Sequence, residues 1–402
     1  MQPSVPSGYT YLDYAATAPL IPEAAEAMEP YFRTGADNLP LNMNANSLHA
    51  PGRAAFAALE DARRSLARDL GASRPDELIL TCGATEADNA AVLGIAHAAA
   101  AQRRGRGRGD FTPQVITTAI EHEAVLQPAR RLEREGFRVT RLSPDHAGFV
   151  SLDALADALD EDTVLVSIQA ANSEVGSIQP IAAAARLAHE AGALFHTDAV
   201  QALGKTPIDL QELGVDAASF SAHKLGGPKG VGALYLKART PFEAQMLGGG
   251  QESDRRSGTQ NVAGAVGFAA ACHVAVQDQE AESARLRALR DRLYARLADI
   301  DGLRPTVPVA PGDGRYLPNI VHVLADGLES ETLILRLDAR GFGVSGGSAC
   351  ASHSLDPSHV LLAMGVEPDR AQGALRVSMG RYTKEEDVDA FARALADALD
   401  WE

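Results

Sequence analysis

In the stretch Ser219-Phe-Ser-Ala-His-Lys-Leu-Gly-Gly-Pro-Lys-Gly230, a predicted apolar strand is followed directly by a lysine and a glycine-rich loop. Lys224 stands there between the Ser221 and His223 pair and the glycines. A lysine in a surface turn would look similar, but Schiff-base chemistry needs an amine whose pKa is lowered by confinement near other cations. A strand that ends in such a loop is typical of open α/β sheets, which place ligands beyond the carboxyl ends of their strands.

On both sides of this strand, short apolar runs alternate with longer helical patterns from about residue 75 onward. The seven candidate strands are Glu77–Thr81, Gln114–Thr118, Phe137–Leu142, Thr163–Gln169, Ala193–Thr197, Ala217–Ser221 and Gly232–Leu236. Strands that alternate with helices favour a largely parallel sheet covered on both faces. We therefore expect an α/β fold with a mostly parallel seven-stranded sheet.

The pattern changes after about residue 262, where a long charged helix over Gly264–Ala298, with a possible interruption, leads into a region with fewer strands. We expect residues 14–262 to form a large ligand-binding domain. Residues 263–402, together with residues 1–13, would form a smaller α+β domain that carries the loop around Cys350.

Composition narrows the classes of function. The formal net charge of -16 argues against binding to a nucleic-acid backbone. Residues 103–109 form an Arg/Gly tract, for which a solvated surface loop is favoured over an RNA contact. The first residues lack the cationic, apolar-cored pattern of a leader, and no apolar run reaches membrane-spanning length. We expect a cytoplasmic protein that contacts no membrane.

The three cysteines are too few and too scattered for a disulfide framework, and they lack the spacing of a zinc site. No metal is expected. Cys350 lies in the small-residue run Val344-Ser-Gly-Gly-Ser-Ala-Cys-Ala-Ser-His353, unlike the setting of a core thiol. A nucleophile on a flexible arm can attack and then carry its cargo outward. This favours a functional Cys350 over a buried structural one.

Two more features follow predicted strands. Gly83-Ala-Thr-Glu86 is a small-residue turn that opens a helix, where free N–H groups and the helix dipole favour a phosphate, although such turns also need glycine for geometry alone. Asp198 follows an apolar run, and in isolation it would be a helix cap. A carboxylate is also what keeps a pyridine nitrogen protonated as an electron sink.

Together these motifs closely resemble the NifS/IscS-like cysteine desulfurases of the class-V aminotransferase family, which are fold-type I pyridoxal-phosphate (PLP) enzymes. The resemblance runs in order through nearly the whole chain. Its segments are Tyr11–Thr17, Asn46–His49, Gly83–Glu86, Thr118–Val125, Asp198–Gln201, Ser221–Lys224, Gly248–Glu252, Arg256–Thr259, Gly347–Cys350 and Arg376–Gly380.

The resemblance implies the residues that hold the cofactor. Lys224 would bind the PLP aldehyde, His122 would stack on the pyridine ring, and Asp198 would pair with its nitrogen. The ring hydroxyl would be contacted by Gln201 and by position 173. The phosphate would be held by Ala84, Thr85, Ser221 and His223, and by Thr259 from a second subunit, so that a homodimer is implied.

The resemblance also implies the reaction. L-Cysteine would give L-alanine and a persulfide on Cys350, with Lys224 moving the α-carbon proton and Arg376 clamping the substrate carboxylate. The sulfur would pass to an acceptor such as an iron–sulfur scaffold or a thiolation enzyme. The alternatives are a selenocysteine lyase, another fold-type I aminotransferase, and a non-catalytic module that binds scaffold proteins. Of these enzymes, the aminotransferase would not need Cys350.

One position departs from the family pattern. Relatives usually carry two asparagines before the Glu of the motif written here as Ala171-Asn-Ser-Glu-Val-Gly176. The second of these falls on Ser173. Its shorter side chain would lose the contact, make it through a water, or leave it to Asn172, which we therefore count among the substrate-binding residues. We expect substrate affinity to depend more on Arg376 than is usual.

Overall fold

The computed structural model describes residues 8–33, 41, 43–107, 111–347 and 357–400, and Cys350 lies outside them. The strands are β1 (Thr10–Tyr11), β2 (Leu78–Thr81), β3 (Gln114–Thr118), β4 (Arg138–Leu142), β5 (Thr163–Ser167), β6 (Leu194–Asp198), β7 (Ala217–Ser221), β8 (Gly232–Leu236), β9 (Leu303–Pro305), β10 (Ile320–Ala325), β11 (Phe342–Gly343) and β12 (Ala374–Ser378).

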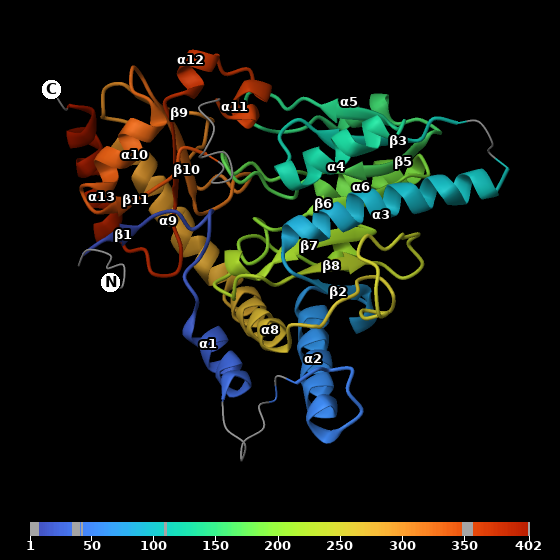
Figure 1. Cartoon of the computed structure of the whole chain (residues 1–402). Helices are drawn as coiled ribbons and strands as arrows, with labels where there is room; N and C mark the ends of the chain where they lie inside the picture. The colour runs from blue at the N-terminus through green and yellow to red at the C-terminus, as the bar shows by residue number, and fades with distance from the viewer. Residues whose placement is uncertain (1–7, 34–40, 42, 108–110, 348–356, 401–402) are drawn as a thin grey trace.

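The α-helices are α1 (Pro22–Met28), α2 (Ala50–Asp69), α3 (Ala84–Gly105), α4 (Glu123–Arg134), α5 (Leu152–Ala158), α6 (Ile181–Glu190), α7 (Leu210–Leu213), α8 (Val262–Gln277), α9 (Gln279–Leu297), α10 (Ser330–Asp338), α11 (His359–Ala363), α12 (Pro368–Ala371) and α13 (Glu385–Leu399). The 3-10 helices are η1 (Glu29–Phe32), η2 (Pro75–Glu77) and η3 (Ala222–Lys224). Figure 1 shows how the elements are arranged.

The central sheet has seven strands in the order β2-β8-β7-β6-β5-β3-β4. The pairs from β7 to β4 are parallel, whereas β8 runs antiparallel to both of its neighbours, β2 and β7. The expected α/β fold with a mostly parallel seven-stranded sheet is confirmed.

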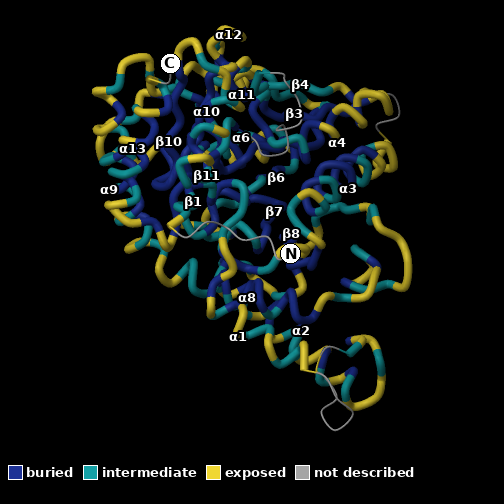
Figure 2. The backbone as a smooth tube through the Cα atoms, turned by 60° about the vertical axis from the view of Figure 1, so that its left-hand side comes forward, coloured by how far each residue is buried: buried dark blue, intermediate teal, exposed yellow. Residues whose placement is uncertain are grey.

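The inner strands of this sheet are buried (Figure 2). Alternate residues of a strand point to opposite faces of the sheet. On β5, Leu165 packs with residues of α3 and α4, while Val166 packs with residues of α2, α6 and α8. Because helices cover both faces, the strands read as continuous apolar runs rather than as alternating patterns.

A second, three-stranded antiparallel sheet with the order β12-β10-β9 follows in the chain. Several of its buried residues, among them Val321, Val323 and Leu375, form an apolar cluster with residues of α9, α10 and α13. The N-terminal strand β1 pairs in parallel with β11, through Thr10 opposite Phe342. The chain's beginning therefore lies against its C-terminal third, and Asp13 is brought beside β12 through a bridge to Ser378.

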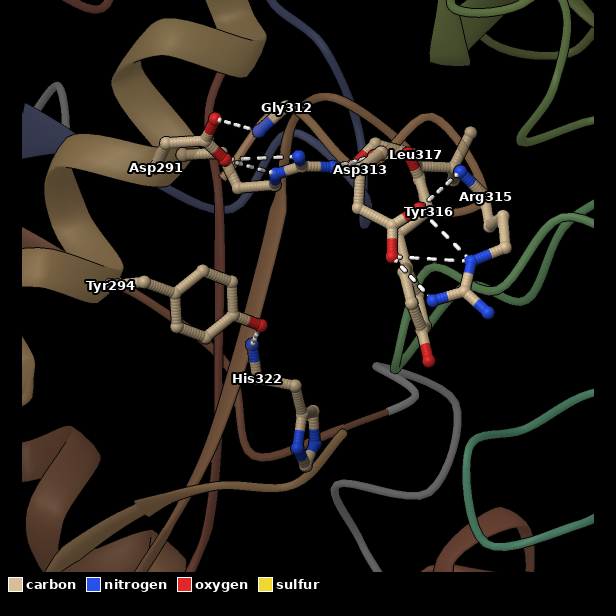
Figure 3. A network of polar contacts seen from close by, with 9 residues as sticks. Asp291, Tyr294, Gly312, Asp313, Arg315, Tyr316, Leu317 and His322 are labelled. Atoms are coloured by element: carbon tan, nitrogen blue, oxygen red, sulfur yellow. Dashed lines mark hydrogen bonds and ion pairs between the residues drawn. The ribbon is translucent and has the colours of Figure 1, made fainter. Parts of the chain in front are cut away.

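The long helix expected after residue 262 is divided. It ends as α8 at Gln277 and restarts as α9 at Gln279, with Asp278 as the cap between them. On α9, the fully buried Arg290 donates to the carbonyls of Asp313, Tyr316 and Leu317 at 3.1 to 3.2 Å and pairs with Asp291. Figure 3 shows Asp291 and the segment from Gly312 to Leu317 in this network. These bonds hold the segment before β10 in place.

The Arg/Gly tract is only partly the surface loop that the sequence favoured. Helix α3 continues through Gly105, and the Arg103 guanidinium donates to the carbonyls of Glu161, Thr163 and Gly192 at 2.7 Å. Arg103 therefore ties α3 to the start of β5 and to the turn before β6. Among the described helices, none combines the length and apolar character needed to cross a membrane.

Candidate active site

A cavity of about 570 Å³ lies where the carboxyl ends of the parallel strands meet. Its wall contains ten of the residues expected from the sequence: Ala84, Thr85, His122, Ser173, Asp198, Gln201, Ser221, His223, Lys224 and Arg376. The turns after β2, β6 and β7 supply most of them, as expected for an open α/β sheet. The cavity thus gathers the candidate residues from segments that are far apart in sequence.

Three expected residues are not in this wall. Asn172 is buried behind it, where its Nδ2 donates to the Ile120 carbonyl at 3.2 Å and its Oδ1 accepts from the N–H groups of Glu174 and Val175 at 2.9 Å. Its amide therefore stabilises a turn, and the substrate contact expected for Asn172 stays a prediction. Thr259 is exposed and does not line the cavity, and Cys350 lies outside the described residues.

Lys224 lies on the short helix η3, directly after β7. Its Nζ donates to the carbonyls of Ala15 at 2.5 Å and Ala16 at 2.9 Å, so that the N-terminal segment holds the amine in the cavity. The surroundings are cationic. Burial, with further effects from Lys224, Lys229 and Lys205, lowers the pKa of His223 to about 4. A lysine in such a setting is suited to attack an aldehyde.

Asp198 ends β6, and its Oδ1 accepts from the Val200 N–H at 3.0 Å. Burial raises the pKa of this carboxyl, whereas that backbone N–H and the charges of His122 and Lys224 lower it. A carboxyl at this position is stabilised in its charged form by a cation docked against it. A protonated ring nitrogen is such a cation.

The backbone of the Gly83–Glu86 turn opens α3 without a side chain capping its first N–H groups. These groups and the positive end of a 22-residue helix are therefore free to bind an anion. The Ser221 and His223 side chains share the same cavity wall. The arrangement fits a phosphate.

Arg376 reaches the cavity from β12 of the other sheet and is only 1% exposed. Its Nη1 donates to the Ser173 carbonyl at 2.9 Å and its Nη2 to Asp13 Oδ1 at 2.8 Å. Its Nε has no hydrogen-bond partner among the described residues. A buried guanidinium with a remaining donor is suited to a carboxylate ligand.

Residues that the sequence reasoning did not single out also shape the site. Asp13 holds Arg376, and Asp88 lines the cavity from the first turns of α3, where burial and the charge of Asp198 raise its pKa well above its usual value. Cys82 is an exposed thiol in the wall, whereas Cys272 is fully buried in the core. The position of Asp88, one helical turn after Ala84, was a signal available in the sequence.

Comparisons with known proteins agree on a family. The model of the class-V aminotransferases matches residues 10–391. The chain is 42% identical over 383 residues to a cysteine desulfurase IscS of Dictyoglomus turgidum, covering 94% of this chain and 91% of that protein. It is 44% identical to an IscS of Edwardsiella ictaluri over 382 residues, covering 94% and 90%.

Solved structures are similar as well. A NifS-like protein superposes with a TM-score of 0.85 at 37% identity, covering 97% of this chain and 99% of that chain. The structure described as SspA in complex with cysteine has a TM-score of 0.76 at 31% identity, covering 93% and 100%.

Proposed function

Because this chain belongs to the class-V aminotransferase family, we propose that it is a PLP-dependent cysteine desulfurase. It converts L-cysteine to L-alanine and leaves the sulfur as a persulfide on Cys350. The observation that carries the proposal is the 42% identity to cysteine desulfurases over 94% of the chain. The meeting of Lys224, Asp198 and Arg376 in one cavity supports it.

The residues of the cavity fit PLP. Lys224 would bind the aldehyde, Asp198 the ring nitrogen, and the start of α3 the phosphate; the support is that all three line one cavity. Gln201 donates through Nε2 to the Ala15 carbonyl at 2.9 Å, and its buried Oε1 has no partner among the described residues, so that it is placed to accept from the ring hydroxyl. When bound, this cofactor accepts the electrons released at the substrate α-carbon.

The substrate carboxylate binds at the guanidinium of Arg376, whose Nε has no partner among the described residues. The backbone carbonyl of Ser173 accepts a hydrogen bond from this arginine, and its short side chain leaves room for the substrate beside it. Lys224 holds and moves the proton at the α-carbon. His122 stays fixed, because its Nδ1 accepts from the Ala124 N–H at 3.1 Å at the start of α4, so that its ring faces the cavity without rotating.

Cys350 accepts the substrate sulfur. In the net reaction the C–S bond of cysteine and the S–H bond of Cys350 break, an S–S bond and the C–H bond of the alanine methyl group form, and the remaining proton stays on the terminal sulfur. Cysteine plus thiol therefore gives alanine plus persulfide, and the atoms and electrons balance without an external oxidant. The persulfide is then passed to an acceptor protein, such as an iron–sulfur scaffold, in the cytoplasm.

The protein acts as a homodimer in which Thr259 reaches the partner's site. Support comes from the exposed apolar residues near that segment, Leu48 at 90% and Leu247 at 83% exposure. The segment that precedes Thr259 is held in place, because Arg63 on α2 binds Glu252 through two hydrogen bonds of 2.6 and 2.9 Å. Apolar side chains on a firmly held surface are typical of a covered interface.

The experiment measures sulfide and alanine after purified protein is mixed with L-cysteine and a reductant, beside a Cys350→Ala variant. Equal amounts of both products from the wild type, and none from a variant that stays yellow, support the proposal. Full activity of the variant would refute the role of Cys350. Formation of a keto acid instead of sulfide would identify an aminotransferase.

A further inference from the structure

A second cavity, of about 320 Å³, lies on the other side of Lys224. Its walls come from the turn after β6, the end of α8, the start of α9 and the segment that follows β12. Lys224 lines both cavities, whereas Arg376, Asp198 and His122 line only the first. The second cavity is therefore separate from the residues that bind the cofactor ring and the substrate, but it touches the same lysine.

One positive charge in the wall of this cavity lacks a negatively charged partner. Lys205 lines it, and no carboxylate among the described residues forms an ion pair with this ammonium. Two acids share the wall, but both face arginines: Glu282 is bound by Arg285 at 2.7 Å, and Asp278 lies 3.9 Å from Arg381. Burial, and then the charge of Lys224, lowers the pKa of Lys205 to about 8, which is the response of a cation that lacks an anion.

A second polar atom in the wall is also unsatisfied. Asn319 is fully buried, its Nδ2 donates to the Met379 carbonyl at 3.3 Å, and its Oδ1 has no partner among the described residues. Buried side-chain oxygens are normally hydrogen-bonded. An amide oxygen only accepts, so that Asn319 would bind a hydroxyl or N–H group of a ligand and not its carboxylate. The remaining wall is largely apolar, with Leu203, Leu225 and Val274 among its residues.

We propose that this second cavity binds a small organic acid, with its carboxylate at Lys205 and a short apolar body against Leu225 and Val274. Ligand sites commonly combine apolar walls with a few fixed polar groups, and the volume of this cavity lies at the lower end of the range that is usual for small-molecule sites. A carboxylate is favoured over a neutral ligand because only an anion compensates the Lys205 ammonium.

A ligand bound in the second cavity would also affect the active site. An anion beside Lys205 offsets part of the cationic field around Lys224, so that the Lys224 nitrogen holds a proton more tightly and transfers it less readily at the substrate α-carbon. The organic acid is thus expected to inhibit the enzyme without competing for Arg376. This regulatory consequence rests on the proposed function, whereas the binding itself does not.

The test uses the holoenzyme and 4-bromobenzoate, whose bromine is located by anomalous scattering in soaked crystals and whose affinity is measured by calorimetry. We expect bromine in the second cavity. We also expect at least a tenfold weaker affinity in Lys205→Met and an unchanged affinity in Arg376→Ala, which removes the carboxylate site of the first cavity. The neutral matched probe 4-bromobenzyl alcohol should bind at least tenfold more weakly than the acid.

Bromine found only beside Arg376, or an affinity that Lys205→Met leaves unchanged, would overturn the proposal. If Lys205→Met does not fold, Ala275→Leu fills the cavity from α8 and should abolish binding, and unchanged binding in that variant would also overturn it. Binding is read without turnover, so that a protein that binds the probe but releases no sulfide would refute only the proposed function.

Discussion

Glu121 provides a prediction whose size follows from the structure. Its side chain is fully buried directly before His122, and its Oε1 accepts from Thr118 Oγ1 at 2.7 Å and from the Gln169 N–H at 2.9 Å. Its Oε2 has no partner among the described residues. Burial raises the pKa of this carboxyl to about 8, above the ordinary value of 4.5.

The sign and size follow from proton linkage. Between pH 4.5 and about 8 the folded state holds a proton on Glu121 that the unfolded state has lost, so that this group's contribution to stability falls as pH rises. The slope is about 1.4 kcal/mol per pH unit, which gives a loss of roughly 2 kcal/mol from pH 6 to 7.5. With an unfolding entropy of roughly 2.1 cal/mol/K per residue, this corresponds to about 2 to 3 °C in Tm.

Glu121→Gln keeps the shape and both accepted hydrogen bonds but does not titrate. We expect the Tm of the variant, relative to wild type, to rise by about 2 to 3 °C when calorimetry is repeated at pH 7.5 instead of pH 6. Buried histidines such as His196 titrate equally in both proteins and cancel. Glu133→Gln is the matched control, because Arg141 keeps the pKa of Glu133 low and its titration lies below this range. A Tm difference for Glu121→Gln that does not change with pH would refute the reasoning.

Three further predictions concern contacts around the site. Ser173→Asn should lower KM for cysteine, because the longer amide adds a contact beside Arg376, and steady-state kinetics would measure it. Asp13→Asn should raise KM about tenfold with kcat nearly unchanged, because a charge-assisted bond that orients Arg376 is weakened by about 1.5 kcal/mol or more. Arg63→Met should destabilise the fold by about 3 to 5 kcal/mol, measured by denaturant unfolding, because Glu252 remains buried without its partner.

Each of these three predictions would be contradicted by a specific result. An unchanged KM in Ser173→Asn would show that the serine position does not contribute to substrate affinity. A lower KM in Asp13→Asn would mean that the carboxylate competes with the substrate instead of orienting the arginine. For Arg63→Met, the control is a double variant that also carries Glu252→Gln, which should recover part of the loss because no buried charge remains. No recovery would contradict the electrostatic explanation.

Much of this protein could be predicted from the sequence because the deciding signals are local. The apolar runs of β5 and β7 required a sheet covered on both faces, and the turn at Gly83 and the loop at Lys224 each follow directly from a strand. When parallel strands are placed side by side, their carboxyl ends meet at one edge of the sheet, so that residues at these ends share a cavity whatever their separation in sequence.

The tertiary structure decided what local pattern does not encode. Arg376 is held by Asp13, 363 residues away, because β1 pairs with β11 and brings the N-terminal segment beside β12. Asn172 was expected at the substrate, but its amide has two backbone N–H groups within reach in its own turn and bonds to them. The lowered pKa of Lys205 likewise depends on the tertiary structure. It results from burial and from the nearby charge of Lys224, which act together only because distant segments of the chain enclose the same cavity.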